Sequence, residues 1–418
     1  MKRGVVLLTV LCLLFAGATA FGSSPNELVV YHWWTAGGEK EAIDALFEAF
    51  IDEHPEYSIV QNPVAGGGGG ILRAQIKTMI MAGNPPDTFQ ITYGHGMISS
   101  FVSVLQPIDD LIKGYNIPED VYEWGRVDGV MYGVPLNLMQ NNCLWYNVDL
   151  VEELGIEMPI KSLDEFLGVC ARIKAEGYIP LAVGAGMGQQ FWLGTLFEAV
   201  NSALPGGGAD FLVDYYAGKT MPSESEVFIE TLKVIRTLIV NGFVNDDWSA
   251  LTWDQASDLM ATGKAVFYVM GDWAKGHFTS MNMVPNVDFG YQPFPGTDDV
   301  FIGHADCFVL PIGVDRKIAK DWIQFLTTVK AANTFCPIKG AAPFVLDAPL
   351  DVYDDITKEI LGYFRDDGVA KVLSQFGAPP ESYLDIFGTA FSEFFNAPEI
   401  NENTLGNFDY AYEEVFLF

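Results

Sequence analysis

The chain has 418 residues, of which 54 are acidic and 23 are lysine or arginine, so its formal net charge is −31. Half of the residues are apolar, which excludes a disordered chain, and the acidity excludes binding to nucleic acid or to anionic membranes through basic patches. The length predicts two domains, because single hydrophobic cores rarely grow beyond about 250–300 residues.

The first twenty residues have the pattern of a secretory signal peptide. Lys2 and Arg3 form a basic start, an apolar stretch covers residues 5–16, and small residues near Ala20 supply a cleavage site. The apolar stretch is shorter than the roughly 20 residues of a membrane-spanning helix. We therefore predict a signal peptide at residues 1–20 and a periplasmic or extracellular protein. Lipid attachment at Cys12 is the alternative.

Strand and helix patterns then alternate along the chain. Short β-branched runs predict strands at 28–31, 57–60 and 88–91. Apolar residues at helical spacing predict helices at 43–51 and 72–80 between them. This order is typical of βαβ units and predicts an α/β fold with a mainly parallel sheet.

The same kinds of pattern return further along the chain. Capping-box patterns predict helices that begin after Ser162 and after Thr252, and a buried strand is expected at 265–270. The last 60 residues read as mostly helical and aromatic-rich. Five consecutive glycines at 66–70 lack the lysine of a phosphate-binding loop. They are therefore either a flexible connection or a loop whose backbone approaches a ligand.

Sequence patterns for catalysis and for metal binding are missing. The five histidines have no zinc-ligand spacing, and no G-x-S-x-G pentapeptide is present. The four cysteines beyond the signal peptide form no C-x-x-C pair, so they are either buried free thiols or an unassigned disulfide. We expect no metal and no cofactor.

Aromatic residues in polar settings favour a binding function. Trp33 and Trp34 follow the first predicted strand, at the end where α/β sheets bind ligands. Adjacent side chains of a strand face opposite ways, so at least one of the two is expected at a surface or cleft. Trp253 and Trp273 also lie beside polar residues. Aromatic faces next to carboxylates and amides are suited to sugar recognition.

Several motifs together resemble the extracellular solute-binding proteins of ABC importers, family 1, and within it the glucose- and mannose-type sugar-binding proteins. They follow one another over almost the whole chain. They are Trp33-Trp34-x-x-Gly37-Gly38-Glu39, Gly83-Asn84-Pro85-Pro86-Asp87-Thr88-Phe89-Gln90, Gly133-Val134-Pro135, Asn141-Asn142-Cys143-Leu144-Trp145-Tyr146-Asn147, Trp253-Asp254-Gln255, Met270-Gly271-Asp272-Trp273-Ala274, Ala305-Asp306 and Ile338-Lys339-Gly340.

The resemblance implies the two-lobed periplasmic-binding-protein fold of type II. Each lobe would be a mainly parallel sheet flanked by helices, with a hinge between the lobes and the ligand in the cleft. The N-terminal lobe would comprise residues 27–135 and 303–345. The C-terminal lobe would comprise residues 136–302 and 346–418.

The resemblance also assigns binding roles, carried over motif by motif. Trp33 and Trp34 would line the cleft, Trp253 would supply a stacking platform, and His304 would lie close to the ligand. The residues expected to hydrogen-bond hydroxyl groups are Glu39, Gln90, Asp306 and Lys339. Thr92 and Phe376 stand where the glucose-type pattern has histidine. This difference predicts a changed ligand preference, so the expected ligand is a sugar and not specifically glucose.

The implied function is that of the exported binding component of an ABC sugar importer. It would bind a mono- or small oligosaccharide as a monomer and deliver it to the permease subunits in the membrane. A secreted glycoside-active enzyme is one alternative, since 54 acidic residues leave room for a catalytic carboxylate pair. A binding protein for a non-sugar solute is the other.

Overall fold

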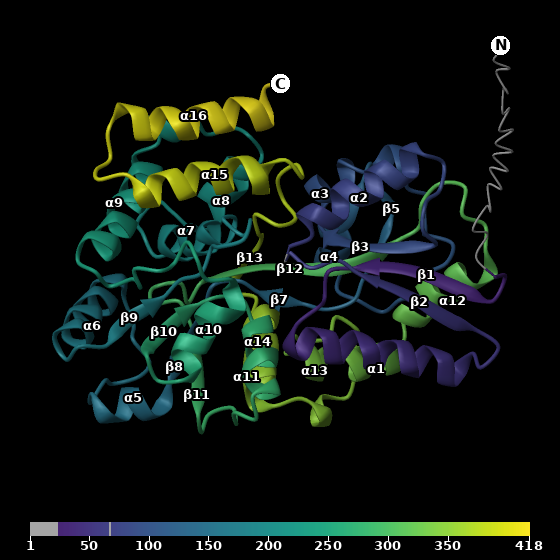
Figure 1. The fold of residues 1–418 in the computed structure, drawn as a ribbon, viewed down its shortest axis with the longest axis horizontal. Helices are drawn as coiled ribbons and strands as arrows, with labels where there is room; N and C mark the ends of the chain where they lie inside the picture. Colours follow the sequence, from purple (N-terminus) through teal and green to yellow (C-terminus); the bar gives the residue numbers. More distant parts are fainter. Residues whose placement is uncertain (1–23, 67) are drawn as a thin grey trace, which may run out of the picture.

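The computed structural model describes residues 24–66 and 68–418, which form two principal sheets flanked by helices (Figure 1). The predicted signal peptide at residues 1–20 and Cys12 lie outside this part of the chain. No helix within the described residues combines the length and the apolar character that crossing a membrane requires.

The larger sheet contains the three strands predicted near the N-terminus. β1, β2 and β3 run parallel, so their carboxyl ends share one edge of the sheet. β12 runs antiparallel to β3 and joins β13, β6 and β7 to the sheet. The seven strands are β1 (Glu27–His32), β2 (Ser58–Pro63), β3 (Thr88–Tyr93), β6 (Gly133–Pro135), β7 (Met139–Gln140), β12 (Val300–Val309) and β13 (Ala370–Leu373).

The smaller sheet has four strands in the order β11-β8-β10-β9. β9, β10 and β11 point the same way, and β8 runs antiparallel to its two neighbours. β8 is the strand through which the chain first enters this sheet. The strands are β8 (Cys143–Asn147), β9 (Ile179–Ala182), β10 (Ala265–Val269) and β11 (Phe289–Pro293), and a separate hairpin pairs β4 (Arg126–Val127) with β5 (Val130–Met131).

The helices around the larger sheet include the predicted amphipathic one. Ile43, Leu46 and Phe50 of that helix are fully buried, and the helix packs against α13. Trp322 of α12 lies 5.2 Å from the Phe50 ring centroid and extends this core. The helices in this part of the molecule are α1 (Gly37–Glu53), α2 (Gly70–Met81), α3 (His95–Ser99), α4 (Glu119–Gly125), α12 (Lys317–Leu326) and α13 (Val329–Lys339).

The C-terminal helices pack on the other part of the molecule (Figure 1). Phe391 of α15 and Phe408 of α16 contact each other at 5.1 Å, and Phe391 lies 5.3 Å from Phe197 of α7. The helices here are α5 (Val148–Glu153), α6 (Leu163–Ala175), α7 (Trp192–Ser202), α8 (Ala209–Tyr216), α9 (Glu226–Val240), α10 (Trp253–Ala261), α11 (Trp273–Ser280), α14 (Asp355–Arg365), α15 (Tyr383–Asn396) and α16 (Glu402–Phe416).

Local signals placed several of these elements correctly. The Ser162 side chain accepts a hydrogen bond from the Glu165 backbone at 3.2 Å, as expected at the start of α6. Thr252 and Gln255 form the reciprocal capping box of α10. β10 is buried along its whole length. The four cysteines at positions 143, 170, 307 and 336 are buried free thiols.

Two short segments carry the chain between the sheets. β6 and β7 both pair with β12, and the chain continues at once into β8 of the smaller sheet. It returns from β11 through residues 294–299 into β12. β12 is ten residues long and completely buried, with β13 and β7 beside its first half and β3 and β6 beside its second half. β12 therefore pairs with strands that lie next to both crossing segments and links them in one sheet.

Candidate functional site

A cavity of about 390 Å³ lies at the carboxyl ends of β1 and β3, beside the central strand β12. The carboxyl ends of strands are the usual ligand-binding position in α/β sheets. The lining residues come from both parts of the molecule. They are Trp33, Glu39, Gly68, Thr92, Met139, Trp192, Trp253, Trp273, His304, Asp306, Lys339 and Phe376.

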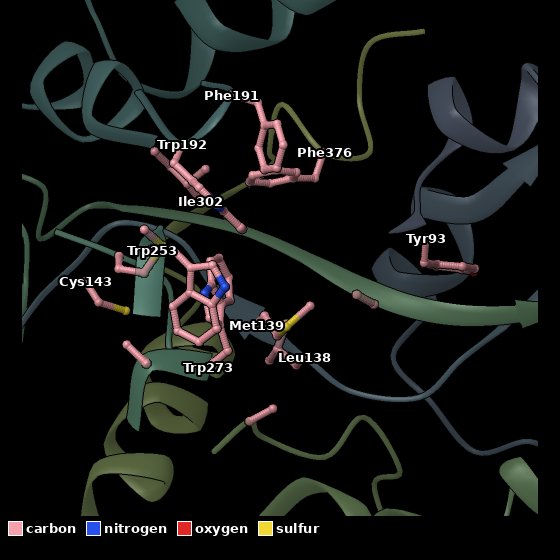
Figure 2. Close-up of a cluster of buried hydrophobic side chains, with 14 of the residues drawn as sticks. Tyr93, Leu138, Met139, Cys143, Phe191, Trp192, Trp253, Trp273, Ile302 and Phe376 are labelled. Atoms are coloured by element: carbon pink, nitrogen blue, oxygen red, sulfur yellow. The ribbon is translucent and has the colours of Figure 1, made fainter. Parts of the chain in front are cut away.

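The walls of the cavity are largely aromatic. Trp192, Trp253 and Trp273 each occupy the first residue of a helix, so three helix N-termini surround the cavity. The Trp192 ring lies 5.3 Å from Trp273 and 5.1 Å from Phe376 (Figure 2). The indole N–H groups of Trp192 and Trp273 have no partner among the described residues. These walls therefore offer mainly apolar faces.

Trp253 is held in place through its backbone. Its N–H donates to the Gln189 side chain at 3.1 Å, and its carbonyl accepts from the Tyr268 hydroxyl at 2.7 Å. The capping box directly before it fixes the start of α10. The indole ring therefore does not provide these contacts and is available to face the cavity.

Two charged residues form an ion pair in the cavity. Lys339, the last residue of α13, is nearly completely buried, and its Nζ lies 2.6 Å from Oε1 of Glu39 in the first turn of α1. The same ammonium lies 5.8 Å from the Trp273 ring centroid. A buried ammonium needs such a counter-charge, because its desolvation costs several kcal/mol.

Asp306 is the second carboxylate of the cavity. It pairs with Thr92 across β12 and β3, and its Oδ1 accepts a hydrogen bond from Gln90 Nε2 at 3.1 Å. Gln90 Oε1 in turn accepts from the Trp33 backbone N–H at 3.1 Å. Burial raises the pKa of Asp306 to about 6, and the Lys339 ammonium opposes that rise. Gln90 thus connects Trp33 with Asp306 from behind the cavity wall.

His304 supplies an uncharged polar group. Its ring lies 4.9 Å from Phe376 and 5.6 Å from Trp273. Burial lowers its pKa to about 3, and the nearby Lys339 ammonium adds to that effect. The ring is therefore neutral at physiological pH, with one nitrogen protonated and the other free to accept a hydrogen bond.

Asp272 is a buried carboxylate next to the cavity wall. Neither of its oxygens has a hydrogen-bond partner among the described residues. Burial raises its pKa to about 8, and the ammonium groups of Lys339 and Lys275 oppose the rise. Lys275 is itself paired with Asp354 at 2.6 Å. Asp272 is thus largely protonated at neutral pH and carries little charge there.

Three glycines bring α1, α11 and α13 into close contact beside the cavity. A Cβ on Gly276 of α11 would lie 2.4 Å from the Lys339 carbonyl oxygen. A Cβ on Gly38 of α1 would lie 2.5 Å from the Gly276 carbonyl oxygen, and one on Gly340 would lie 2.6 Å from the Gly276 nitrogen. Only glycine permits this backbone approach, which brings Glu39, Lys339 and Trp273 together.

Eight of the ten residues named from the sequence line the cavity, and two do not. Trp34 is fully buried on the opposite face, where it packs 4.8 Å from Phe335 and 5.9 Å from Phe308. The alternation of side chains that turns Trp33 toward the cavity turns Trp34 into the core. Gln90 is also fully buried and supports its neighbours instead of lining the cavity.

Four lining residues were not among these ten, namely Gly68, Met139, Trp192 and Trp273. Trp273 was noted for its polar neighbours and stood in a quoted motif, but nothing in that motif distinguished a cavity wall from the core. Trp192 follows a loop with no recognisable pattern. Gly68 belongs to the glycine run, where a Cβ would lie 2.8 Å from the Phe191 ring. Of the two alternatives for the glycine run, a flexible connection or a backbone close to a ligand, the position of Gly68 at the cavity fits the second.

A metal centre does not form within residues 24–66 and 68–418. No group of three or more histidine, cysteine, aspartate or glutamate side chains gathers there in a way that could hold an ion. The polar groups of the cavity are instead two carboxylates, one ammonium, one imidazole and one hydroxyl.

Comparison with known proteins identifies the family. The family of bacterial extracellular solute-binding proteins matches residues 36–333. An uncharacterized ABC transporter extracellular-binding protein of Pyrococcus horikoshii is 37% identical over 389 residues, which cover 90% of this chain and 85% of that relative. A probable sugar-binding periplasmic protein of Mesorhizobium japonicum is 29% identical over 401 residues, which cover 92% of this chain and 94% of that relative.

A solved structure confirms the predicted two-lobed fold. A chitin oligosaccharide binding protein superposes with a TM-score of 0.81 at 19% identity, over 94% of this chain and 99% of that one. The family match, the full-length relatives and the shared architecture agree with one another. The chain belongs to the bacterial extracellular solute-binding protein family.

Proposed function

We propose that the protein is the exported binding component of an ABC sugar importer and binds a mono- or small oligosaccharide in the cavity. The observation that carries this proposal is the combination of four tryptophans with Glu39, Asp306 and Lys339 around one cavity. The C–H faces of a pyranose stack on aromatic rings, and its hydroxyl groups form hydrogen bonds with charged partners. The name of the Mesorhizobium japonicum relative supports the same ligand class.

The roles of the lining residues follow from their chemistry. Trp33, Trp253 and Phe376 supply apolar faces, and Trp192 and Trp273 complete the aromatic wall. The hydrogen-bonding groups are Glu39, Thr92, His304, Asp306 and Lys339.

Binding would close two lobes around the sugar. The N-terminal lobe comprises residues 27–135 and 303–345, and the C-terminal lobe comprises residues 136–302 and 346–418. The segments at 136–142 and 294–299, where the chain passes between the sheets, would act as the hinge together with the connection between α13 and α14 near residue 345. The closed form would then be recognised by the permease subunits.

The cellular context completes the proposal. Residues 1–20 direct export and are removed, and the mature protein works outside the cytoplasm as a single chain. Its partners are the sugar and the permease, without nucleic acid. The family is one of binding proteins, and the same cavity would hold the sugar without cleaving it.

A thermal-shift screen tests the ligand class. The purified protein is heated with a panel of mono- and disaccharides and, as a second panel, with amino acids. A ligand at about 100 times its Kd adds about 2.7 kcal/mol to the free energy of unfolding and raises Tm. We expect a rise with at least one sugar and none with amino acids. A rise confined to amino acids would contradict the proposal.

The enzyme alternative has its own test. The raised pKa of Asp306 is a property that a general acid would need, so hydrolysis deserves a direct assay. The protein is incubated with oligosaccharides that bind in the screen, and reducing ends are counted over time. We expect no release above the buffer control. Release that Asp306→Asn abolishes would establish a glycoside-active enzyme instead.

A further inference from the structure

A row of three buried side chains leads from the protein interior to the cavity. Glu198 of α7 contacts Asn141 in the crossing segment, and Asn141 contacts His304 in the cavity wall. We propose that Glu198, acting through Asn141, determines which nitrogen of His304 carries the proton and so whether His304 accepts or donates a hydrogen bond in the cavity. The consequence of this proton position for sugar selection rests on the proposed function.

The contacts of Glu198 orient its carboxylate. Oε1 accepts hydrogen bonds from the Gln375 backbone N–H at 2.7 Å and from the Tyr216 hydroxyl at 2.8 Å. Oε2 accepts from Asn141 Nδ2 at 3.2 Å. Glu198 and Asn141 are both fully buried. An ionised carboxylate can only accept, so it holds the amide nitrogen of Asn141 toward itself.

This orientation of Asn141 fixes the proton on His304. With its nitrogen turned to Glu198, Asn141 presents Oδ1 to His304 Nδ1 at 2.8 Å. A carbonyl oxygen cannot donate, so Nδ1 must carry the hydrogen. The Ser374 hydroxyl, 3.3 Å from Nδ1, can donate or accept and does not oppose this arrangement.

The remaining nitrogen of His304 is then an acceptor at the cavity. His304 is neutral, because burial lowers its pKa to about 3, so Nε2 has a lone pair and no proton. Nε2 has no hydrogen bond within the described part of the chain. With Glu198 ionised, His304 would accept a hydrogen bond from a sugar hydroxyl and could not donate one.

Protonation of Glu198 would reverse this polarity. A proton on Oε2 would donate to Asn141, whose amide would rotate and present its nitrogen to His304 Nδ1. Nδ1 would then accept, and the proton of His304 would reside on Nε2. The titratable groups that face Glu198 are the phenols of Tyr216 on α8 and Tyr383 on α15. Burial raises the pKa of Glu198 to about 7, so both states are accessible near neutral pH.

The substitution Glu198→Gln tests the proposal without changing the shape of the side chain. The Gln375 N–H and the Tyr216 hydroxyl converge on the position of Oε1, so glutamine should place its oxygen there. Its NH₂ group would then face Asn141 and rotate that amide. We expect the Glu198→Gln variant to hold His304 in the Nε2–H form at every pH.

Nitrogen-15 NMR of the imidazole rings reads the protonated nitrogen directly, in the protein without sugar. For the wild-type protein at pH 8.5 we expect the signal of an unprotonated Nε2, and for Glu198→Gln that of a protonated Nε2. Glu230→Gln, which changes an exposed glutamate of α9, should behave as wild type. A protonated Nε2 in the wild type at pH 8.5, or the same tautomer in both proteins, would overturn the proposal.

Two further readouts separate this proposal from the proposed function. In wild type alone, lowering the pH through about 7 should protonate Nε2, and an unchanged tautomer would contradict the role of Glu198 even if Glu198→Gln does not fold. With a sugar from the screen, Glu198→Gln should change affinity or sugar preference at least threefold. If the tautomer switches and sugar binding is unchanged, His304 does not contact the sugar. If no sugar binds the wild type, only the proposed function fails.

Discussion

Among the single residues of the cavity, the most tightly linked are Glu39 and Lys339, which share one ion pair out of bulk water. The ammonium of Lys339 also acts on the pKa of Asp306 and of His304. The ammonium makes Asp306 easier to ionise than burial alone would. It also makes His304 harder to protonate. One lysine therefore influences the protonation of two neighbouring groups in the cavity.

Substitution of Lys339 should be costly because it leaves a carboxylate without its partner. Breaking a buried pair costs about 3–5 kcal/mol, and Glu39 is slightly exposed, so we expect about 3 kcal/mol for Lys339→Met. The free energy of unfolding in urea measures it. The double variant Glu39→Gln, Lys339→Met should recover part of the loss. Equal stability of the single and double variants would contradict the expectation that the unpaired Glu39 carboxylate causes the loss.

At the residue scale, the sequence predicted which types of side chain form the cavity better than it predicted where each side chain points. Strand alternation implied that one residue of Trp33-Trp34 would leave the core, but it did not say which one. Gln90 stood in a quoted motif and proved to support Asp306 from behind. Glu198 and Asn141 could not be placed near His304, because their proximity depends on how α7 and the crossing segment pack.

Among the helices, the glycine contact between α1, α11 and α13 determines which side chains meet at the cavity. α1 and α13 flank the larger sheet, and α11 follows β10 of the smaller one. Their contact brings Glu39, Trp273 and Lys339 to the same cavity. A change at this contact is therefore expected to alter how closely the helices beside the two sheets approach each other.

A methyl group at Gly276 should therefore keep the lobes apart. Gly276→Ala places a Cβ 2.4 Å from the Lys339 carbonyl oxygen, a backbone atom that cannot easily move. We expect at least tenfold weaker sugar binding in calorimetry and a larger radius of gyration in solution scattering with sugar present. Gly362→Ala is the matched control, since that helical glycine of α14 has nothing within 4 Å of its Cβ. Unchanged binding by Gly276→Ala would contradict this expectation.

At the scale of elements, local signals were sufficient near the N-terminus. The strands and helices up to β3, and the helix starts marked by Ser162 and Thr252, follow from periodicity and capping. β13 was missed within a segment that reads as helical, because it is four residues long and owes its pairing to β12. β8 runs antiparallel to β10 because the chain enters it from the crossing segment after β7. No local sequence pattern predicts that path.

For the whole molecule, the buried carboxyl groups and the net negative charge both make the folded state less stable as the pH rises. Burial raises the pKa of Asp272 to about 8, of Glu198 to about 7 and of Asp306 to about 6. In the unfolded chain these groups ionise near pH ~4. The net charge of −31 adds repulsion as more acids ionise.

Stability should consequently fall as the pH rises. Between about pH 6.5 and pH 8 the folded protein binds more protons than the unfolded chain, because Asp272 and Glu198 stay protonated only in the folded state. At lower pH this difference is offset, because the buried His32 and His304 have lowered pKa values and gain protons only on unfolding. We expect a higher Tm at pH 6.5 than at pH 8.5. Asp272→Asn removes one of the three groups and should reduce the slope. A Tm that rises over this range would contradict the assigned pKa shifts.

The central claim is that the aromatic cavity binds a sugar, and titration calorimetry of Trp253→Ala tests it most directly. Trp253 lines the cavity, while its backbone contacts to Gln189 and Tyr268 do not need the indole. We expect roughly 30-fold weaker binding of the sugar found in the screen, about 2 kcal/mol, measured at a temperature where the variant is folded. The control Trp124→Ala removes a tryptophan outside the cavity and should bind as wild type. Wild-type affinity in Trp253→Ala would contradict the account.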